Sequence, residues 1–324
     1  MKRRDFVGVM GVAIASLSGV FAQQTLAKIW RVSYLYPGSL DNPADRKIFD
    51  AFREEMRSLG YIEGKNFLLD SKSADGKIER LPALVSEMIA LRPDVFVAIA
   101  TPAIAAAQRA TSTIPIVMAP ATDPVGSGFV KSLAHPGGNI TGMANMNGDS
   151  IGKTVELLFA VVPAAKRIAV LMSSNTSHPW QYELAEAAIK KLGLVPVPIK
   201  APTSADLAPA FERMKHENCD ALFVLADPTR PTIVSLAAKF NVPAIYQNAI
   251  YVEMGGLLSY GSALEPIFRK VAHYVDEILK GEDPAELPVE QPIVFDLAIN
   301  LKTATALGLT IPDSVVARAD RVIE

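Results

Sequence analysis

Short apolar runs alternate with longer amphipathic runs along most of the chain. Residues 95–100 and 116–119 are continuously apolar, as expected for strands that are covered on both faces of a sheet. Residues 45–59 predict a helix because their apolar side chains recur at helical spacing, at Ile48, Phe49, Phe52, Met56 and Leu59. Strands 30–36 and 67–71 and helices 79–91 and 102–109 complete this first series. Strands separated by helices predict parallel βαβ crossovers.

A second series of the same kind begins near residue 150. It predicts helices at 151–162, 179–192, 206–216 and 231–240, and strands at 167–172, 195–199, 221–225 and 244–246. The two series match in order. For example, Leu59-Gly60-Tyr61 ends one helix and Leu192-Gly193-Leu194 ends its counterpart, while Ile114-Pro115-Ile116 matches Val242-Pro243-Ala244. The repetition predicts two similar doubly wound, Rossmann-like α/β lobes.

The C-terminal elements do not form a third copy. The C-terminal elements are predicted to complete both lobes; they are strands 257–260 and 293–299 and helices 264–279 and 301–307. The chain would then cross between the lobes more than once, which predicts a multi-strand hinge. We therefore expect one lobe to comprise residues 28–146 and 252–288, and the other residues 147–251 and 289–324.

The first 27 residues have the composition of a secretion signal. Lys2, Arg3 and Arg4 precede an apolar stretch, residues 6–21, that is short for a membrane span. Cleavage is expected after Ala22 or Ala27. The adjacent arginines resemble a twin-arginine signal, although an ordinary Sec signal fits as well and a retained anchor is a third reading. No cysteine lies near the cleavage points, so a lipid anchor is not expected.

Composition limits the chemistry further. The net charge is -2 and no basic run follows the signal, which argues against nucleic acid as a partner. The single cysteine, Cys219, excludes intrachain disulfides and a cysteine-based metal site. The four histidines, His135, His178, His216 and His273, are scattered. There is no Walker motif, no glycine-rich dinucleotide motif and no Gly-x-Ser-x-Gly elbow, so neither a catalytic residue nor a metal site is predicted.

A ligand cleft is expected where the strand-end loops of both lobes meet, because ligands of open parallel sheets bind beyond the carboxyl ends of the strands. Thr101 begins a helix and can hold a carboxylate, Asp123 can pair with an amino group, and Asp227 holds the equivalent place in the second lobe. For each loop residue, helix capping is the alternative role. The complete set of predicted ligand-binding residues is Tyr36, Ser39, Thr101, Pro102, Thr122, Asp123, Asn145, Ser174, Asn175, Trp180, Asp227, Gln247, Asn248 and Tyr260.

Several longer motifs resemble one known family. They are Leu59-Gly60-Tyr61-Ile62-Glu63-Gly64, Asp123-Pro124-Val125-Gly126-Ser127-Gly128, His135-Pro136-Gly137-Gly138-Asn139, Gly255-Gly256-Leu257-Leu258-Ser259-Tyr260-Gly261 and Ala306-Leu307-Gly308-Leu309-Thr310-Ile311-Pro312. As a set they resemble the substrate-binding proteins of bacterial ABC transporters, in the family that includes tryptophan- and tyrosine-binding members. The resemblance covers nearly the whole chain.

The resemblance implies a type I periplasmic-binding fold whose lobes close on a small organic ligand such as an amino acid or another carboxylate. It implies no cofactor, no catalysis, and delivery of the ligand to an ABC permease in the inner membrane. Together with the expected secretion signal, this predicts a protein of the periplasm, and we expect it to be a monomer. Two cleft segments depart from the family pattern, at 173–176 and 247–250, so the resemblance does not fix the ligand. Two alternatives stay open: an exported α/β enzyme that uses Asp123 or Asp227, and a ligand sensor that docks to a membrane receptor.

Overall fold

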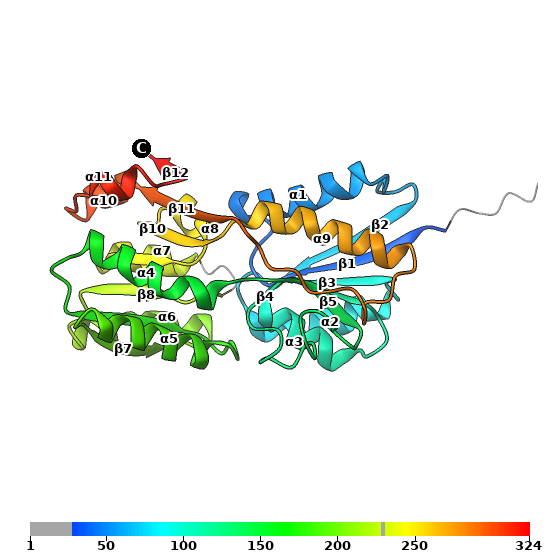
Figure 1. Ribbon diagram of the computed structural model, residues 1–324, viewed down its shortest axis with the longest axis horizontal. Helices are drawn as coiled ribbons and strands as arrows, with labels where there is room; N and C mark the ends of the chain where they lie inside the picture. Colours follow the sequence, from blue (N-terminus) through cyan, green and yellow to red (C-terminus); the bar gives the residue numbers. More distant parts are fainter. Residues whose placement is uncertain (1–27, 228–230) are drawn as a thin grey trace, which may run out of the picture.

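Two α/β lobes lie side by side along the longest axis of the molecule (Figure 1). The computed structural model describes residues 28–227 and 231–324. The expected secretion signal at residues 1–27 lies outside the described residues. Over the part of the chain that is described, no helix is both long enough and apolar enough to cross a membrane.

The first lobe is built on a parallel five-stranded sheet, and we call it the five-stranded lobe. Its strand order is β2-β1-β3-β4-β5. The strands are β1 (Trp30–Tyr36), β2 (Phe67–Ser73), β3 (Val95–Ala98), β4 (Ile116–Ala121) and β5 (Ile140–Ala144). The helices are α1 (Pro43–Ser58), the 3-10 turn η1 (Ile78–Arg80), α2 (Leu81–Ala90), α3 (Ala100–Ala110) and α9 (Leu264–Leu279).

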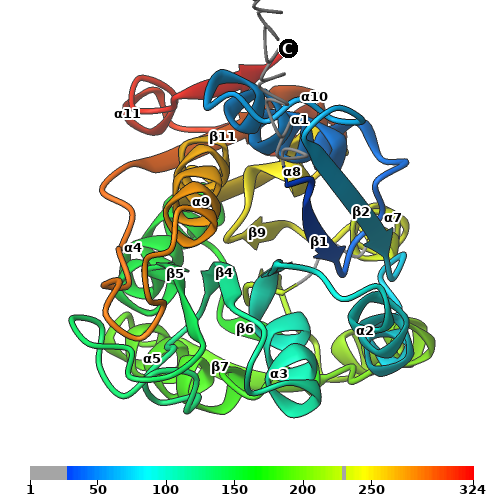
Figure 2. The same ribbon diagram turned by 90° about the vertical axis from the view of Figure 1, so that its right-hand side faces the viewer.

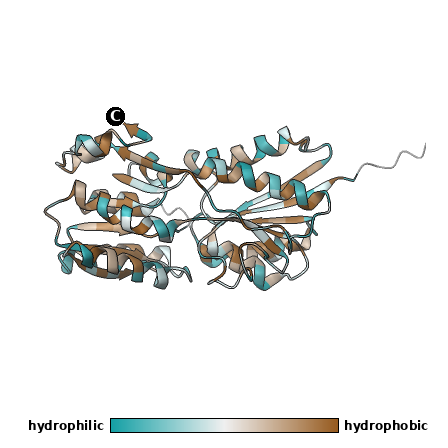
Figure 3. Cartoon of the chain, viewed as in Figure 1, coloured by the Kyte–Doolittle hydropathy of each residue, from teal (hydrophilic) through white to brown (hydrophobic). Residues whose placement is uncertain are grey.

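Alternation of side chains along each strand sends apolar groups to both faces of this sheet. Helices α1 and α9 cover one face and α2 and α3 the other (Figure 2). On β1, Tyr34 packs against Phe49 of α1 with ring centroids 4.8 Å apart, whereas the next residue, Leu35, lies in the opposite core. Hydrophobic residues accordingly concentrate on the strands (Figure 3). The continuously apolar strands of the sequence are therefore explained by burial on both faces.

The second lobe is built on a seven-stranded sheet, and we call it the seven-stranded lobe. Its strand order is β12-β11-β10-β9-β8-β6-β7. The strands are β6 (Arg167–Met172), β7 (Val195–Lys200), β8 (Ala221–Val224), β9 (Ala244–Tyr246), β10 (Leu258–Ser262), β11 (Phe295–Asn300) and β12 (Arg321–Ile323). The helices are α4 (Asn147–Val161), α5 (His178–Lys191), η2 (Ser204–Asp206), α6 (Leu207–His216), α7 (Thr232–Lys239), α8 (Ala249–Glu253), α10 (Leu301–Ala306) and α11 (Asp313–Val316).

The predicted α/β duplication is confirmed by the strand order. Strands β7-β6-β8-β9-β10 repeat the order β2-β1-β3-β4-β5, and every pairing within both sets is parallel. Strand β11 then adds antiparallel to β10, and β12 adds parallel to β11. Strands β5 and β12 and the short helices α8 and α11 were not predicted from the sequence. Helices α1 and α3 start two residues earlier than predicted, at Pro43 and Ala100, and α4 starts four residues earlier, at Asn147.

Within the described residues, the chain crosses between the lobes three times. The crossings lie between β5 and α4, between β10 and α9, and between α9 and β11. Two of them are tied to the third: Ala144 N donates to Glu290 O at 2.8 Å, and Ala263 N donates to Val294 O at 3.0 Å. Such backbone pairing links the crossings into one hinge.

The second crossing differs from the expected one. We expected residues 252–288 to belong to the first lobe, but β10 pairs with β9 (Leu258 beside Ile245) and with β11, which places it in the seven-stranded sheet. Only α9 returns to the five-stranded lobe, where it packs on α1. We therefore propose lobes of residues 28–146 with 263–290, and 147–262 with 291–324.

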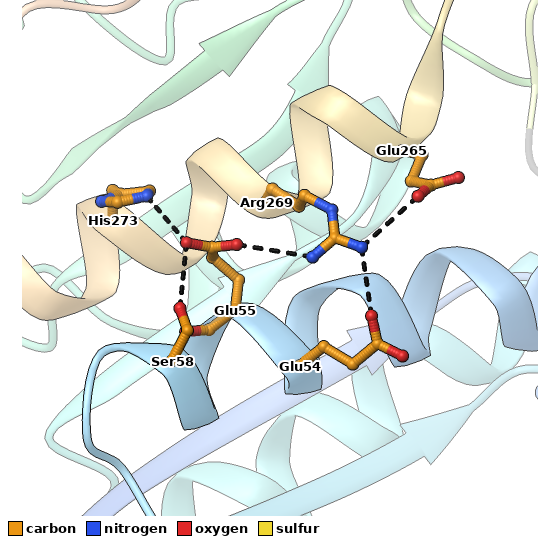
Figure 4. A network of polar contacts seen from close by, with 6 residues as sticks. All are labelled: Glu54, Glu55, Ser58, Glu265, Arg269 and His273. Atoms are coloured by element: carbon orange, nitrogen blue, oxygen red, sulfur yellow. Dashed lines mark hydrogen bonds and ion pairs between the residues drawn. The ribbon is translucent and has the colours of Figure 1, made fainter.

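A polar network on the surface marks where α9 rejoins α1 (Figure 4). Arg269 of α9 contacts Glu54 at 3.1 Å and Glu55 at 3.4 Å, and His273 lies 3.1 Å from Glu55. Exposed ion pairs contribute little to stability, about 0–1 kcal/mol each. The buried contact of Phe268 with Tyr34, 6.4 Å between ring centroids, belongs to the core that holds α9 in place.

Candidate functional site

A cavity lies between the lobes, at the carboxyl ends of strands from both sheets. It encloses about 670 Å³, counting the part that is open to solvent. It is lined by Tyr36, Pro37, Ile48, Ile99, Ala100, Thr101, Pro120, Thr122, Asn145, Asn147, Asn175, Ala226, Asp227, Gln247, Asn248, Ser262, Leu264 and Phe268.

The N-terminus of α3 faces this cavity from the five-stranded lobe. Ala100 and Thr101, the first residues of the helix, line the cavity, and no side chain caps the helix. The first N–H groups of a helix lack intrahelical acceptors and carry partial positive charge. Ala100 has a φ of 61°, which is uncommon for a residue other than glycine and is found at functional sites. This end of the cavity suits an anion such as a carboxylate.

Thr101 is held in place at this helix end. It is 2% exposed, and its Oγ1 accepts a hydrogen bond from Thr122 N at 3.2 Å. Thr122 Oγ1 in turn accepts from Asn145 Nδ2 at 2.8 Å. A threonine hydroxyl that accepts one bond still has a proton to donate. Thr101 can therefore add a hydroxyl donor to the helix N–H groups.

An apolar wall adjoins the helix end. Ile48 of α1 and Leu264 and Phe268 of α9 line the cavity together with the ring of Tyr36. Tyr36 is 4% exposed, and its hydroxyl donates to Asp45 Oδ1 at 2.6 Å, which fixes the ring. A wall of this kind lowers the free energy of a ligand that buries apolar surface against it.

Gln247 organises the opposite side, on the seven-stranded lobe. Its Oε1 accepts from Ala226 N at 2.9 Å and its Nε2 donates to Asn147 O at 2.9 Å. The buried side chain thus clamps the end of β8 to the start of α4. These contacts engage both the oxygen and the nitrogen of the amide. Gln247 therefore holds Ala226 and Asn147 in position and has little hydrogen-bonding capacity left for a ligand.

Asn147 presents an available carboxamide to the cavity. The residue is 5% exposed, and its side chain makes no hydrogen bond with any described residue. Its backbone is fixed on both sides, by the Gln247 contact and by donation from Asn147 N to Asn145 Oδ1 at 3.2 Å. A fixed amide can both donate to and accept from a ligand. This residue was not predicted from the sequence, because the predicted helix begins at residue 151 and not at Asn147.

Asp227 supplies a negative charge at the end of β8. It is the one charged side chain among the described residues that line the cavity. Its neighbour Ala226 is tied to His178, which is 1% exposed: His178 Nε2 lies 2.9 Å from Ala226 O, while Nδ1 accepts from Ser173 N at 2.8 Å. This pattern requires a neutral imidazole with its proton on Nε2. His178 therefore has a structural role beside the site.

The structure brings together eight of the fourteen predicted residues and leaves six outside the cavity lining. Inside are Tyr36, Thr101, Thr122, Asn145, Asn175, Asp227, Gln247 and Asn248; outside are Ser39, Pro102, Asp123, Ser174, Trp180 and Tyr260. Pro102 and Ser174 line a neighbouring groove between the lobes. Ser39 Oγ donates to Asp75 at 3.2 Å, and Tyr260 stacks on Phe295 with ring centroids 5.6 Å apart.

Asp123 was a leading candidate, and the structure gives it a different task. Its φ is 45° and its Oδ1 accepts from Gly126 N at 2.9 Å, so the carboxylate closes its own turn. Trp180, which is 42% exposed, lies against Gly148, where an added Cβ would approach the ring to 2.2 Å. In both cases the alternative of a local structural role fits the geometry.

The apolar lining residues were also missed, since apolar side chains in helices are expected to be core. No cluster of three or more histidine, cysteine, aspartate or glutamate side chains that could hold a metal ion occurs in residues 28–227 and 231–324. The described part of the cavity therefore offers a helix end, carboxamides, one carboxylate and an apolar wall.

Comparison with known proteins gives this site a context. Residues 38–323 match the family model described as ABC transporter substrate binding protein. A curated relative, the tyrosine-binding protein of Clostridioides difficile, is 29% identical over 275 residues, which cover 83% of this chain and 79% of the relative.

Two solved structures share the architecture to different degrees. An ABC domain from Streptococcus pneumonia in complex with L-Trp is 30% identical, with a TM-score of 0.82, and the match covers 91% of this chain and 99% of that one. A substrate-binding protein with adhesive properties from Clostridium difficile, in its ligand-free, open form, is 25% identical, with a TM-score of 0.61 over 91% of this chain and 99% of that one.

Proposed function

The chain belongs to the ABC transporter substrate-binding protein family, and from this premise we propose that its cavity captures an amino acid whose side chain is uncharged and largely apolar. Proteins of this family bind small-molecule ligands and deliver them to an ABC permease. The fold is the type I periplasmic-binding fold of its structural relatives. The observation that carries the proposal is the pairing of an uncapped helix N-terminus with a single carboxylate across an apolar cavity.

The ligand's two charged groups have one complement each. The N-terminus of α3, with Thr101, fits a carboxylate by partial positive charge and by N–H and O–H donors. Asp227 fits the ammonium group by charge. No further charged side chain of the described residues lines the cavity. A third charge on the ligand would therefore have no partner among the described residues, and burial of an unpaired charge costs several kcal/mol.

The relatives support the same chemical class. L-Trp is bound in the Streptococcus pneumonia structure, and the Clostridioides difficile relative is named for tyrosine. Both ligands are amino acids with large uncharged side chains. The wall formed by Ile48, Leu264 and Phe268 matches such a side chain in character.

The arrangement of the lobes supports closure around the ligand. It resembles the L-Trp complex, at a TM-score of 0.82, more than the ligand-free, open structure, at 0.61. A direct hydrogen bond also joins the lobes, from Ser204 Oγ to Gly76 O at 3.1 Å. We propose that this is the closed form and that the three crossings act as its hinge.

Substrate-binding proteins of ABC importers are exported. We propose that residues 1–27 direct this export by the Sec or the twin-arginine route, that the signal is cleaved, and that the protein acts in the periplasm as a monomer without a lipid anchor. The relatives found by comparison are substrate-binding proteins and not enzymes. We propose that this chain is likewise not an enzyme and that Asp227 binds the ligand without catalysing a reaction.

The test is a thermal-shift and calorimetry screen of the purified protein against the standard amino acids. A ligand present at 100 times its Kd should raise the free energy of unfolding by about 2.7 kcal/mol. Uncharged amino acids with large side chains should give the largest shifts, and lysine and glutamate none. A shift for charged or very small amino acids alone, or for none, would overturn the proposal.

A further inference from the structure

Ser262, the last residue of β10, carries a hydroxyl that has no hydrogen-bond partner among the described residues. The residue is 6% exposed and its Oγ is closed off from water. A buried polar atom without a partner destabilises the folded protein, and such atoms are rare. Because Ser262 also lines the cavity, its missing partner can be supplied by the ligand.

The surroundings of Ser262 identify which part of the ligand it meets. Ser262, Asn248, Ile48 and Leu264 line both the ligand cavity and a smaller compartment of about 350 Å³ beside it. Ser262 therefore belongs to the wall that Ile48 and Leu264 form, which is the apolar part of the cavity. The compartment behind this wall is polar, with Lys47, Glu253, Glu265, Asp296 and Arg321 in its lining.

We propose that Ser262 donates to or accepts from a polar atom at the far end of the ligand's side chain. On this assignment, which rests on the proposed amino-acid ligand, the protein selects an apolar side chain that carries a hydroxyl or N–H group over a plain hydrocarbon one. A serine hydroxyl can both donate and accept, so it suits either group. A site that hydrogen bonds to such a group discriminates against the analogue that lacks it, because the protein group is then left unpaired.

The chain offers a matched control on the same strand. Ser259 is 0% exposed, and its Oγ is also buried without a described partner, but it does not line the cavity. Replacing either serine by alanine removes an unsatisfied buried hydroxyl at nearly constant volume. Both variants should therefore fold, with a thermal midpoint equal to or above that of the original protein when no ligand is present.

L-tyrosine and L-phenylalanine differ only by the terminal hydroxyl, so titration calorimetry with this pair measures the contact. We expect the original protein to bind L-tyrosine about two- to tenfold more tightly than L-phenylalanine. Ser262→Ala should lose this preference through weaker binding of L-tyrosine, with binding of L-phenylalanine unchanged. Ser259→Ala should keep the preference.

Several results would overturn the assignment. Equal binding of the two amino acids by the original protein would do so, as would a preference that survives Ser262→Ala. An equal loss of both ligands in Ser262→Ala would show a general structural effect and would also count against it. If amino acids bind but the preference does not follow Ser262, this inference fails while the proposed function stands. If no amino acid binds, the proposed function fails and the inference fails with it.

Discussion

The two lobes share a strand order but present different chemistry to the cavity between them. The five-stranded lobe contributes the α3 helix end with Thr101 and an apolar wall, whereas the seven-stranded lobe contributes Asp227 and the carboxamides of Asn147, Gln247 and Asn248. The duplicated sheets explain why a cleft exists, and the unlike loops explain what can bind there. Because the two sides differ, a zwitterionic ligand has one favoured orientation.

The largest effect is expected from Asp227→Asn, which removes the only charge on the described cavity lining. Truncating one member of a buried charge pair costs about 2–5 kcal/mol, which corresponds to a loss of affinity of about thirtyfold or more. Calorimetry with the best amino-acid ligand measures it. Asp123→Asn is the matched control, because that carboxylate closes its own turn and should leave the affinity unchanged. Equal losses of affinity in the two variants would show that Asp227 does not bind the ligand's ammonium group.

Gln247→Leu should have the next largest effect, because it breaks the clamp within the seven-stranded lobe. Ala226 N would lose its acceptor at a cost of about 1–3 kcal/mol in the free energy of unfolding, and Asn147 would lose its support. Urea unfolding and calorimetry should both show a loss.

Gln181→Leu provides the comparison for the clamp. Gln181 is 0% exposed in the same lobe, donates to Ser177 Oγ at 3.0 Å and does not line the cavity. It should lower stability while leaving affinity intact. If Gln247→Leu behaves in the same way, the clamp does not position ligand contacts.

Thr101→Val tests the five-stranded side with a smaller change. It removes a hydroxyl that can donate to the ligand's carboxylate, and it leaves Thr122 N without its acceptor. We expect a loss of affinity of about tenfold or more, since hydrogen bonds to charged groups contribute about 1.5–3 kcal/mol. Thr101→Ser should retain most of the binding. Thr141→Val, at a buried threonine that donates to Leu287 O, should cost stability alone.

Ala100→Gly should have the smallest effect and the opposite sign. With a φ of 61°, Ala100 is strained where glycine would not be. Relief of the strain contributes about 1–2 kcal/mol, and the greater entropy of glycine in the unfolded chain offsets about 0.4–1 kcal/mol of it. The substitution should therefore raise the free energy of unfolding by about 0.5–1 kcal/mol. Denaturant titration measures this. A lower stability would mean that the Ala100 side chain packs favourably enough to outweigh its strain.

Much of the fold could be predicted from the sequence because the two copies repeat the same apolar runs in the same order. The β10 crossing could not, since a strand of five residues has the same pattern whichever sheet it joins. The difference was decided by pairing with β9 and β11, which are distant in sequence from one another.

The lining of the cavity was predictable where strand ends are polar, as at Thr101, Asp227 and Gln247. It was not predictable where the same residue types serve their own loop, as at Asp123, because the sequence does not show which way a carboxylate points. Asn147 was missed because the predicted helix begins at residue 151, whereas the helix in the structure begins at Asn147 itself. Phe268 could not be predicted as a cavity residue, because it lies on α9, and the position of α9 depends on the chain crossings of the hinge.

The central claim is the division of the ligand between the lobes, and a crystal structure with the amino acid that gives the largest thermal shift tests it most directly. We predict the carboxylate within hydrogen-bond distance of the α3 N-terminus and Thr101, the ammonium group on Asp227, and the side chain against Ile48, Leu264 and Phe268. A ligand bound in the reverse orientation, or with its carboxylate held on the seven-stranded lobe, would contradict the account.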